Sequence, residues 1–149
     1  MGNIDIAGII VAIRKQFFSL RNGMIADTLR KGGLEQKYIF GLQLPQIKEI
    51  ASQFHSDDNN ETAEIARCLW SDRECREARL LACHLMPPSM MTEKEAKEWA
   101  EDVRTREEAD ILAFRLLRYV ASNRSIIMWL KDSDSDLKKY TATAIERFI

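Results

Sequence analysis

The segment SDRECREARLLACHLMPP, residues 71–88, decides the fold class of this chain. Ser71 and Glu74 have the spacing of a capping box, in which each side chain accepts a hydrogen bond from the other residue's backbone N–H, so we expect a helix to begin there. Pro87 and Pro88 end it, because the residue before a proline avoids the helical region. The apolar residues in between share one helical face: Ala78, Leu81, Ala82, Leu85 and Met86. The segment therefore predicts a short amphipathic helix with one buried face.

Similar signals recur on both sides of this segment. Pro45 suits the first position of a helix, and an apolar stripe follows it. Thr92 with Glu95, and Thr105 with Glu108, form two further capping boxes. No segment alternates between polar and apolar residues over a useful length, so we predict an all-α chain.

The expected helices of about 10–16 residues are joined by short connections, which makes neighbouring helices antiparallel. Repeated helix pairs of this size favour an α-solenoid with a HEAT-like period of about 40 residues. Because the repeats resemble one another only weakly in sequence, a compact helical bundle is the alternative that periodicity leaves open. No linker or low-complexity segment interrupts the chain, so we predict a single HEAT-like helical repeat domain over residues 1–149.

The composition excludes several classes of site. The formal net charge is −1, whereas a chain that grips nucleic acid along its whole surface is usually basic, so DNA binding here requires a local basic face. The three cysteines fit neither a CxxC pair nor a zinc ribbon, and the two histidines are isolated. No glycine-rich phosphate loop or Ser-His-Asp series is present. We therefore predict no metal site and no cofactor.

The apolar run at residues 6–13 is the longest near the start of the chain. It is too short to span a bilayer, and it lacks the flanking basic and small residues of a signal peptide. We therefore expect no membrane association and a cytoplasmic location.

Four stretches, taken in order, carry a resemblance to a known family: YIFGLQLPQIKEIA (38–51), AEIARCLWSDRECREARLLACHLM (63–86), WAEDVRTREEADIL (99–112) and MWLKDSDSDLKKYTATA (128–144). Together they resemble the AlkD-like DNA alkylation repair family, whose members are HEAT-like repeat DNA glycosylases. The chain looks like a short and divergent member of that family. The resemblance implies a right-handed superhelix of HEAT-like repeats with a concave surface that faces DNA. It also implies removal of cationic N3- or N7-alkylated purines, the activity of the family's active members.

By this resemblance, Asp110 matches the family's catalytic acid. A carboxylate near C1′ stabilises the positive charge that builds on the sugar as the glycosidic bond breaks, and it can orient the attacking water. In active relatives the position four residues before this acid is aromatic, whereas here it is Arg106. We also expect no counterpart of the family's later repeats, which add another aromatic residue and further DNA contacts.

Arg106 and Asp110 admit two interpretations. At a separation of four residues on a helix, they can form a surface ion pair worth about 0.3–0.5 kcal/mol, which would neutralise the acid. Alternatively, Arg106 contacts a DNA phosphate and leaves Asp110 free to act.

The other candidates for substrate or DNA binding are Trp99, Arg79, Lys138 and Lys139. Trp99 falls on or next to an apolar stripe, where it either packs between helices or offers an aromatic shelf to a base or sugar. Arg79 either reaches a carboxylate on a neighbouring helix or contacts phosphate. Lys138 and Lys139 lie either on a solvated helix face or against phosphate.

Two functions therefore stand side by side. The first is an alkylpurine DNA glycosylase that uses Asp110. The second is a non-catalytic HEAT-like scaffold that binds nucleic acid or a protein partner in its groove. DNA is the expected partner in the first case, and the sequence makes no prediction about oligomeric state.

Overall fold

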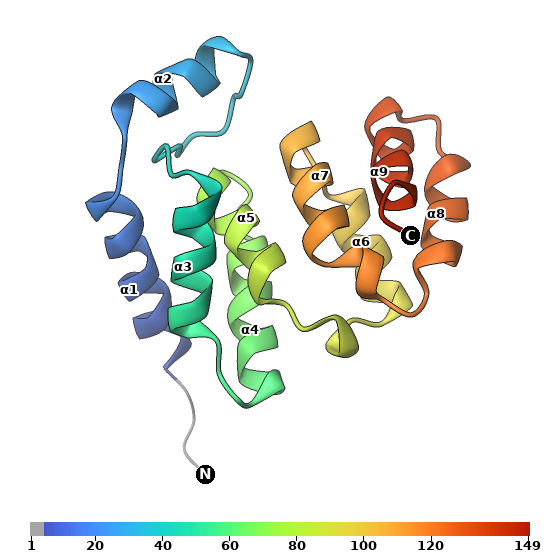
Figure 1. Ribbon diagram of the computed structural model, residues 1–149, viewed down its shortest axis with the longest axis horizontal. Helices are drawn as coiled ribbons and strands as arrows, with labels where there is room; N and C mark the ends of the chain where they lie inside the picture. Colours follow the sequence, from blue (N-terminus) through green and yellow to red (C-terminus); the bar gives the residue numbers. More distant parts are fainter. Residues whose placement is uncertain (1–4) are drawn as a thin grey trace. The chain divides into compact units, whose positions relative to one another are not determined.

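The computed structural model describes residues 5–149 (Figure 1). This part of the chain contains nine α-helices, two 3-10 helices and no β-strand, so the prediction of an all-α fold is confirmed. The α-helices are α1 (Ile6–Ser19), α2 (Gly23–Lys31), α3 (Leu44–Phe54), α4 (Asn59–Trp70), α5 (Arg76–Leu85), α6 (Glu93–Glu101), α7 (Arg106–Arg115), α8 (Asn123–Lys131) and α9 (Asp136–Glu146). The 3-10 helices are η1 (Pro88–Met90) and η2 (Leu117–Tyr119).

Contacts between the helices divide the chain after Leu85 into two compact units. The N-terminal unit holds α1 to α5, and the C-terminal unit holds α6 to α9. The presence of a single HEAT-like repeat domain over residues 1–149 stays a prediction.

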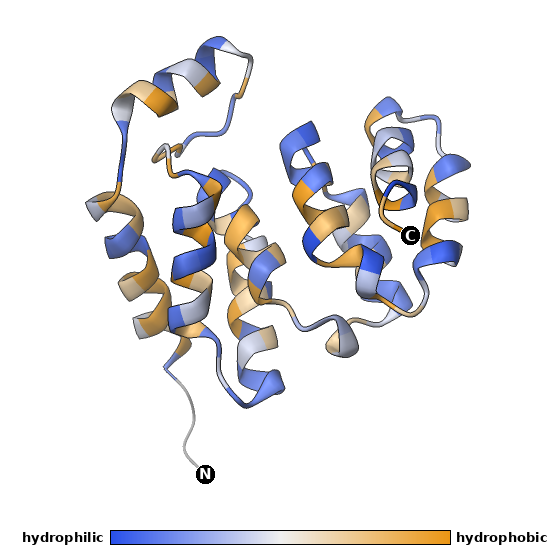
Figure 2. Cartoon of the chain, in the orientation of Figure 1, coloured by the Kyte–Doolittle hydropathy of each residue, from blue (hydrophilic) through white to orange (hydrophobic). Residues whose placement is uncertain are grey.

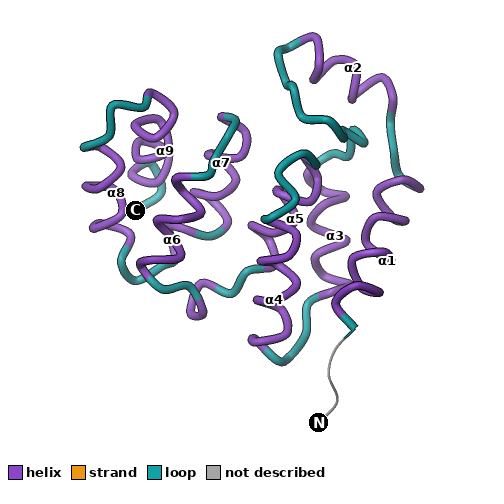
Figure 3. The backbone as a smooth tube through the Cα atoms, turned by 180° about the vertical axis from the view of Figure 1, so that it is seen from behind, coloured by secondary structure: helices purple, strands orange, loops and turns teal. Residues whose placement is uncertain are grey.

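In the N-terminal unit, α4 and α5 form a helical hairpin, with α3 beside α5 (Figures 1 and 3). The helix α1 contacts α4. Both views show α2 standing apart from these four helices. Figure 2 shows α1 as hydrophobic along most of its length, in agreement with the apolar run noted in the sequence. The fully buried apolar side chains of this unit include Ile13, Phe17, Leu42, Ile47, Ile50, Leu80 and Leu81.

The first turn of α5 carries a buried carboxylate, that of Glu77, which is 0% exposed. Its Oε1 accepts a hydrogen bond from the backbone N–H of Phe40 at 3.0 Å. Its Oε2 accepts from the backbone N–H groups of Gly41 at 3.0 Å and Leu42 at 3.3 Å. Nη1 of Arg76 donates to the same Oε2 at 2.7 Å and to the carbonyl of Leu42 at 2.9 Å. These bonds tie the segment that precedes α3 to the start of α5.

Gly41 allows this segment to approach the start of α2. Its φ of +86° lies in the left-handed region that favours glycine. A Cβ at this position would lie 2.2 Å from the carbonyl oxygen of Asn22. The backbone N–H of Asn22 donates to the carbonyl of Phe40 at 2.8 Å, and its side chain accepts from two N–H groups in the first turn of α2.

The helix predicted to begin near Ser71 begins later, at Arg76, so the prediction of a capping box there is wrong. Ser71 instead ends α4, where its hydroxyl donates to the carbonyl of Cys68 at 2.6 Å. The carboxylate of Glu74 accepts from the backbone N–H of Lys37 at 3.2 Å. Long-range hydrogen bonding at the α4–α5 turn therefore overrides the local capping signal.

In the C-terminal unit, α8 packs against α9, α7 lies beside α9, and α6 lies beside α8. Of the two predicted capping boxes, the threonine half is present in each, since the hydroxyls of Thr92 and Thr105 accept from the backbone N–H groups of Glu95 and Glu108, each at 3.1 Å. The carboxylate of Glu108 accepts from the backbone N–H of Arg104 at 3.0 Å. The rings of Phe114 on α7 and Phe148, just after α9, meet edge to face at a centroid distance of 5.0 Å. The contact helps to hold α7 and α9 side by side.

The helices α5, α7 and α9 recur at a shorter interval than the sequence suggested. Because α5, α7 and α9 begin at Arg76, Arg106 and Asp136, their starts lie 30 residues apart. This spacing replaces the expected period of about 40 residues. Residues that differ by 30 in number therefore occupy the same position in α7 and α9.

The Glu77 carboxylate gives a direct test of this architecture. We expect Glu77→Gln to lower the free energy of unfolding by about 2–4 kcal/mol, because an amide cannot satisfy the three backbone donors and the Arg76 guanidinium at once. Urea denaturation measures the change. Glu49→Gln, the same substitution at an exposed position of α3, is the control and should change the free energy by less than about 0.5 kcal/mol. Equal effects of the two substitutions would contradict this account.

Candidate functional site

Asp110 lies in the second turn of α7 and is partly exposed. Its Oδ1 accepts a hydrogen bond from the hydroxyl of Tyr140 on α9, with an oxygen–oxygen distance of 2.8 Å. The two residues differ by 30 in number, so each occupies the same position in its helix. The side-by-side contact of α7 and α9 therefore brings the carboxylate and the phenol together.

Arg106 is not the partner of Asp110. Its guanidinium lies over the ring of Tyr140, with Cζ 4.8 Å from the ring centroid, and its side chain is exposed. Within residues 5–149, no ion pair joins Arg106 to Asp110. Of the two interpretations of this pair, the surface ion pair is therefore wrong, because the tyrosine ring holds the arginine.

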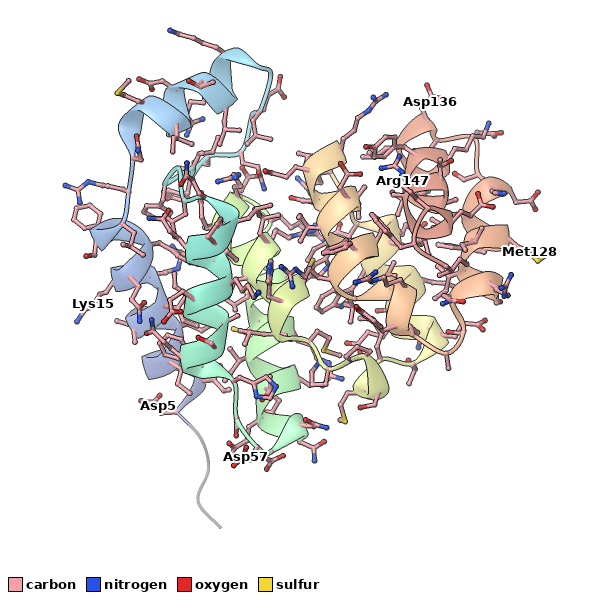
Figure 4. The ribbon with its side chains drawn as sticks, viewed as in Figure 1. Asp5, Lys15, Asp57, Met128, Asp136 and Arg147 are labelled. Carbon is pink, nitrogen blue, oxygen red and sulfur yellow. The ribbon has the colours of Figure 1, made fainter. Side chains whose placement is uncertain are left out.

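The neighbouring charged groups shift the pKa of the Tyr140 phenol. Its hydrogen bond to the carboxylate of Asp110 raises the pKa of Tyr140, and the nearby charges of Arg147 and Arg106 oppose that shift only in part. Arg147 follows the last turn of α9, and Figure 4 labels it together with Asp136 at the start of the helix. The neutral phenol is thus the form that the folded protein favours.

The carboxylates of Glu77 and Asp110 differ in the number of hydrogen bonds that they accept. A carboxylate offers about four acceptor sites. Glu77 accepts four hydrogen bonds, three from backbone N–H groups and one from Arg76. Asp110 accepts one within residues 5–149, on Oδ1, and is partly exposed. The geometry gives Glu77 a structural role and leaves Asp110 with acceptor capacity for a ligand or a water.

Beyond Asp110, an arginine–aromatic cluster continues the contact of α7 with α9. The guanidinium of Arg118 lies 4.3 Å from the ring centroid of Phe114, 4.5 Å from that of Tyr119 and 5.6 Å from that of Phe148. Arg115 also approaches Phe114, at 5.4 Å. This cluster places further positive charge at the end of α7, with Arg115, and on η2, with Arg118.

Two of the predicted binding residues are buried. The guanidinium of Arg79 packs over the ring of Trp70 at 3.8 Å, and the arginine is 0% exposed. Trp99 is 5% exposed, near the end of α6. Burial of this kind gives both residues a packing role, and their contact with DNA stays a prediction.

The two predicted lysines differ from each other. Lys138 donates to Oε1 of Glu101 at 3.2 Å, whereas Lys139 is exposed and makes no ion pair within residues 5–149. Lys138 lies two residues before Tyr140, or about 200° around α9, so it faces away from Asp110. It borders an open pocket of about 310 Å³ that Glu101, Trp129, Asp132 and Ser133 also line. The candidate site therefore contains Asp110, Tyr140 and Arg106, and Lys138 lies outside it.

The described residues offer few alternatives to a carboxylate site. They hold no group of three or more His, Cys, Asp or Glu side chains able to bind a metal ion. Burial raises the pKa of the Cys75 thiol to about 12, which removes it as a nucleophile. None of the helices described has the length and apolarity needed to cross a bilayer.

The sequence did not reveal Tyr140 as a member of the site. A period of about 40 residues does not bring Tyr140 to the position that corresponds to Asp110, whereas the observed spacing of 30 residues between the starts of α7 and α9 does. The missing signal was therefore the length of the repeat.

A family model described as DNA alkylation repair enzyme matches residues 13–145. The matched range includes helices of both units and contains Arg106, Asp110 and Tyr140. No curated protein and no solved structure matches the chain.

The bond between Tyr140 and Asp110 predicts a change in tyrosine titration. We expect Asp110→Asn to lower the pKa of Tyr140 towards its ordinary value of about 10, because it removes the hydrogen bond to a carboxylate and the negative charge beside the phenol. The stabilisation from this bond should be complete below the pKa of an unfolded tyrosine and disappear as pH rises through the raised pKa of the folded state. Ultraviolet absorbance of tyrosinate against pH measures the shift, and Tyr140→Phe identifies the transition. A transition at Tyr140 that Asp110→Asn leaves unmoved would contradict the assignment.

Proposed function

The chain belongs to the DNA alkylation repair enzyme family, and we propose that it is an alkylpurine DNA glycosylase in which Asp110 is the catalytic acid. Its substrates are cationic N3- or N7-alkylated purines in DNA. The observation that carries the proposal is the Asp110 carboxylate itself, which is partly exposed, held by one phenol and not neutralised by Arg106.

The chemistry suits a carboxylate in this setting. An alkylated purine carries a positive charge, so it leaves as a neutral base when the electron pair of the C1′–N bond moves onto its ring. Positive charge builds on the sugar at the same time, and the Asp110 carboxylate stabilises it through space. Water then bonds to C1′, and its proton passes to Asp110 or to solvent. The products are a free base and an abasic site.

The charges around Asp110 support binding of a polyanion. Arg106 and Lys139 are exposed on α7 and α9, and Arg147 lies close enough to Tyr140 to influence its pKa. Phosphate contacts of this kind dominate the affinity of proteins for DNA. A local basic face of this type reconciles DNA binding with a net charge of −1.

We extend the proposal to the fold and the location. Helices in corresponding positions pack together within each unit, α3 beside α5 and α7 beside α9. The HEAT-like right-handed superhelix with an AlkD-like groove for DNA is a proposal that rests on the family resemblance. The free cysteines Cys68, Cys75 and Cys83 are compatible with the proposed cytoplasmic location.

The second candidate function is a non-catalytic scaffold that binds nucleic acid or a protein partner. It is favoured by Arg106, which occupies the position where active relatives of the AlkD-like type carry an aromatic residue, and by the burial of Arg79 and Trp99. Salt distinguishes the two kinds of partner, because affinity for DNA falls steeply as salt concentration rises. No affinity for DNA at low salt would favour a protein partner.

Base release from alkylated DNA tests the enzymatic proposal. We expect the wild type to release 7-methylguanine or 3-methyladenine, and Asp110→Asn to slow release by about 10²–10³-fold because the developing charge loses its counterion. Asp134→Asn, at an exposed acid between α8 and α9, is the matched control and should leave the rate unchanged. Chromatography of the released bases gives the rates. A wild-type rate no higher than that without protein would rule out the glycosylase.

A further inference from the structure

We infer that Tyr140 is a positioning residue that keeps the Asp110 carboxylate available by separating it from Arg106. This inference rests on the proposed function of Asp110. It assigns two tasks to a single side chain, one to its hydroxyl and the other to its ring.

The hydroxyl fixes the carboxylate. Tyr140 donates to Oδ1 of Asp110 at 2.8 Å, which is a normal length for a hydrogen bond between a hydroxyl and a carboxylate oxygen. The donor comes from α9 and the acceptor from α7, so the bond orients Asp110 relative to a second helix rather than within its own. Because Tyr140 binds Oδ1 alone, Oδ2 remains open to a sugar or a water.

The ring holds the arginine. Arg106 precedes Asp110 by four residues on α7, a separation at which side chains of opposite charge ordinarily meet. Its guanidinium instead lies over the Tyr140 ring, 4.8 Å from the centroid. A cation within about 6 Å of an aromatic face is attracted by the quadrupole of the ring. The ring thus offers Arg106 a partner other than Asp110.

The two tasks serve the same end. A carboxylate paired with a guanidinium has much of its charge neutralised, and it would stabilise a positively charged sugar poorly. A phenol carries no charge, so its hydrogen bond orients the acid without cancelling its field. Tyr140 therefore orients the carboxylate without neutralising its charge, whereas a lysine or arginine at the same position would neutralise it.

Base release at saturating DNA separates the hydroxyl from the ring. We expect Tyr140→Phe, which keeps the ring, to slow release on the order of tenfold with DNA affinity unchanged, because one hydrogen bond to a charged group is lost. Tyr140→Leu removes the ring as well, so Arg106 is released onto Asp110 and the rate falls further. Tyr38→Phe is the control, since Lys37 lies over its ring at 5.3 Å and its backbone, not its hydroxyl, bonds the α4–α5 turn.

The decisive variant is Arg106→Gln in the Tyr140→Leu background. It should raise the rate towards that of Tyr140→Phe, because the neutralising cation has been removed. A tyrosine with a merely structural role would show no such rescue. The inference is overturned if Arg106→Gln fails to raise the rate of Tyr140→Leu, or if Tyr140→Phe is as slow as Tyr140→Leu.

A second measurement does not require activity. The coupling between Arg106→Gln and Asp110→Asn is the difference between the shift in thermal unfolding midpoint of the double variant and the sum of the two single shifts. It should be small in the wild-type background, where the two side chains share Tyr140 as a partner but do not pair. In the Tyr140→Leu background it should be larger, and salt should weaken it. A coupling as large with Tyr140 intact as without it would overturn the inference. If the wild type releases no base but the coupling grows when Tyr140 is replaced, the proposed glycosylase fails while the positioning role of Tyr140 stands.

Discussion

A carboxylate whose acceptor sites are all filled organises the N-terminal unit. Glu77 draws three consecutive backbone N–H groups, those of Phe40, Gly41 and Leu42, onto the first turn of α5. Because a buried charge is stable only when it is paired and hydrogen-bonded, departure of this segment would leave the Glu77 carboxylate with Arg76 as its one remaining partner within residues 5–149. The left-handed conformation of Gly41 follows from the same constraint, since the segment must also meet the start of α2.

Asp110 shows the opposite use of the same functional group. It sits at the surface of the C-terminal unit with one hydrogen bond, supplied by a side chain from the neighbouring helix. Full satisfaction makes a carboxylate a structural element, and partial satisfaction makes it available for chemistry. Glu77 is held mainly by backbone N–H groups, which gives it a structural role. Asp110 is held by a phenol, which leaves it as a candidate functional residue.

The sequence predicted the parts of this protein that depend on local interactions. Helical periodicity gave the all-α class, and the threonine caps at Thr92 and Thr105 are local signals that the structure confirms. The cap expected at Ser71 failed because Glu74 bonds Lys37, which no local rule anticipates. Asp110 was identified by resemblance, whereas Tyr140 was missed because its role depends on the interval between helix pairs.

The origin of Asp110 and Tyr140 in two successive helix pairs makes the site sensitive to mechanical deformation. A slide of α9 along α7 changes the length and the angle of the 2.8 Å hydrogen bond between them, and hydrogen bonds weaken steeply as their angle departs from linearity. Any force that moves α9 relative to α7 therefore changes the hydrogen bond that orients the Asp110 carboxylate. The packing of two helices and the orientation of the Asp110 carboxylate are thus linked through one hydrogen bond.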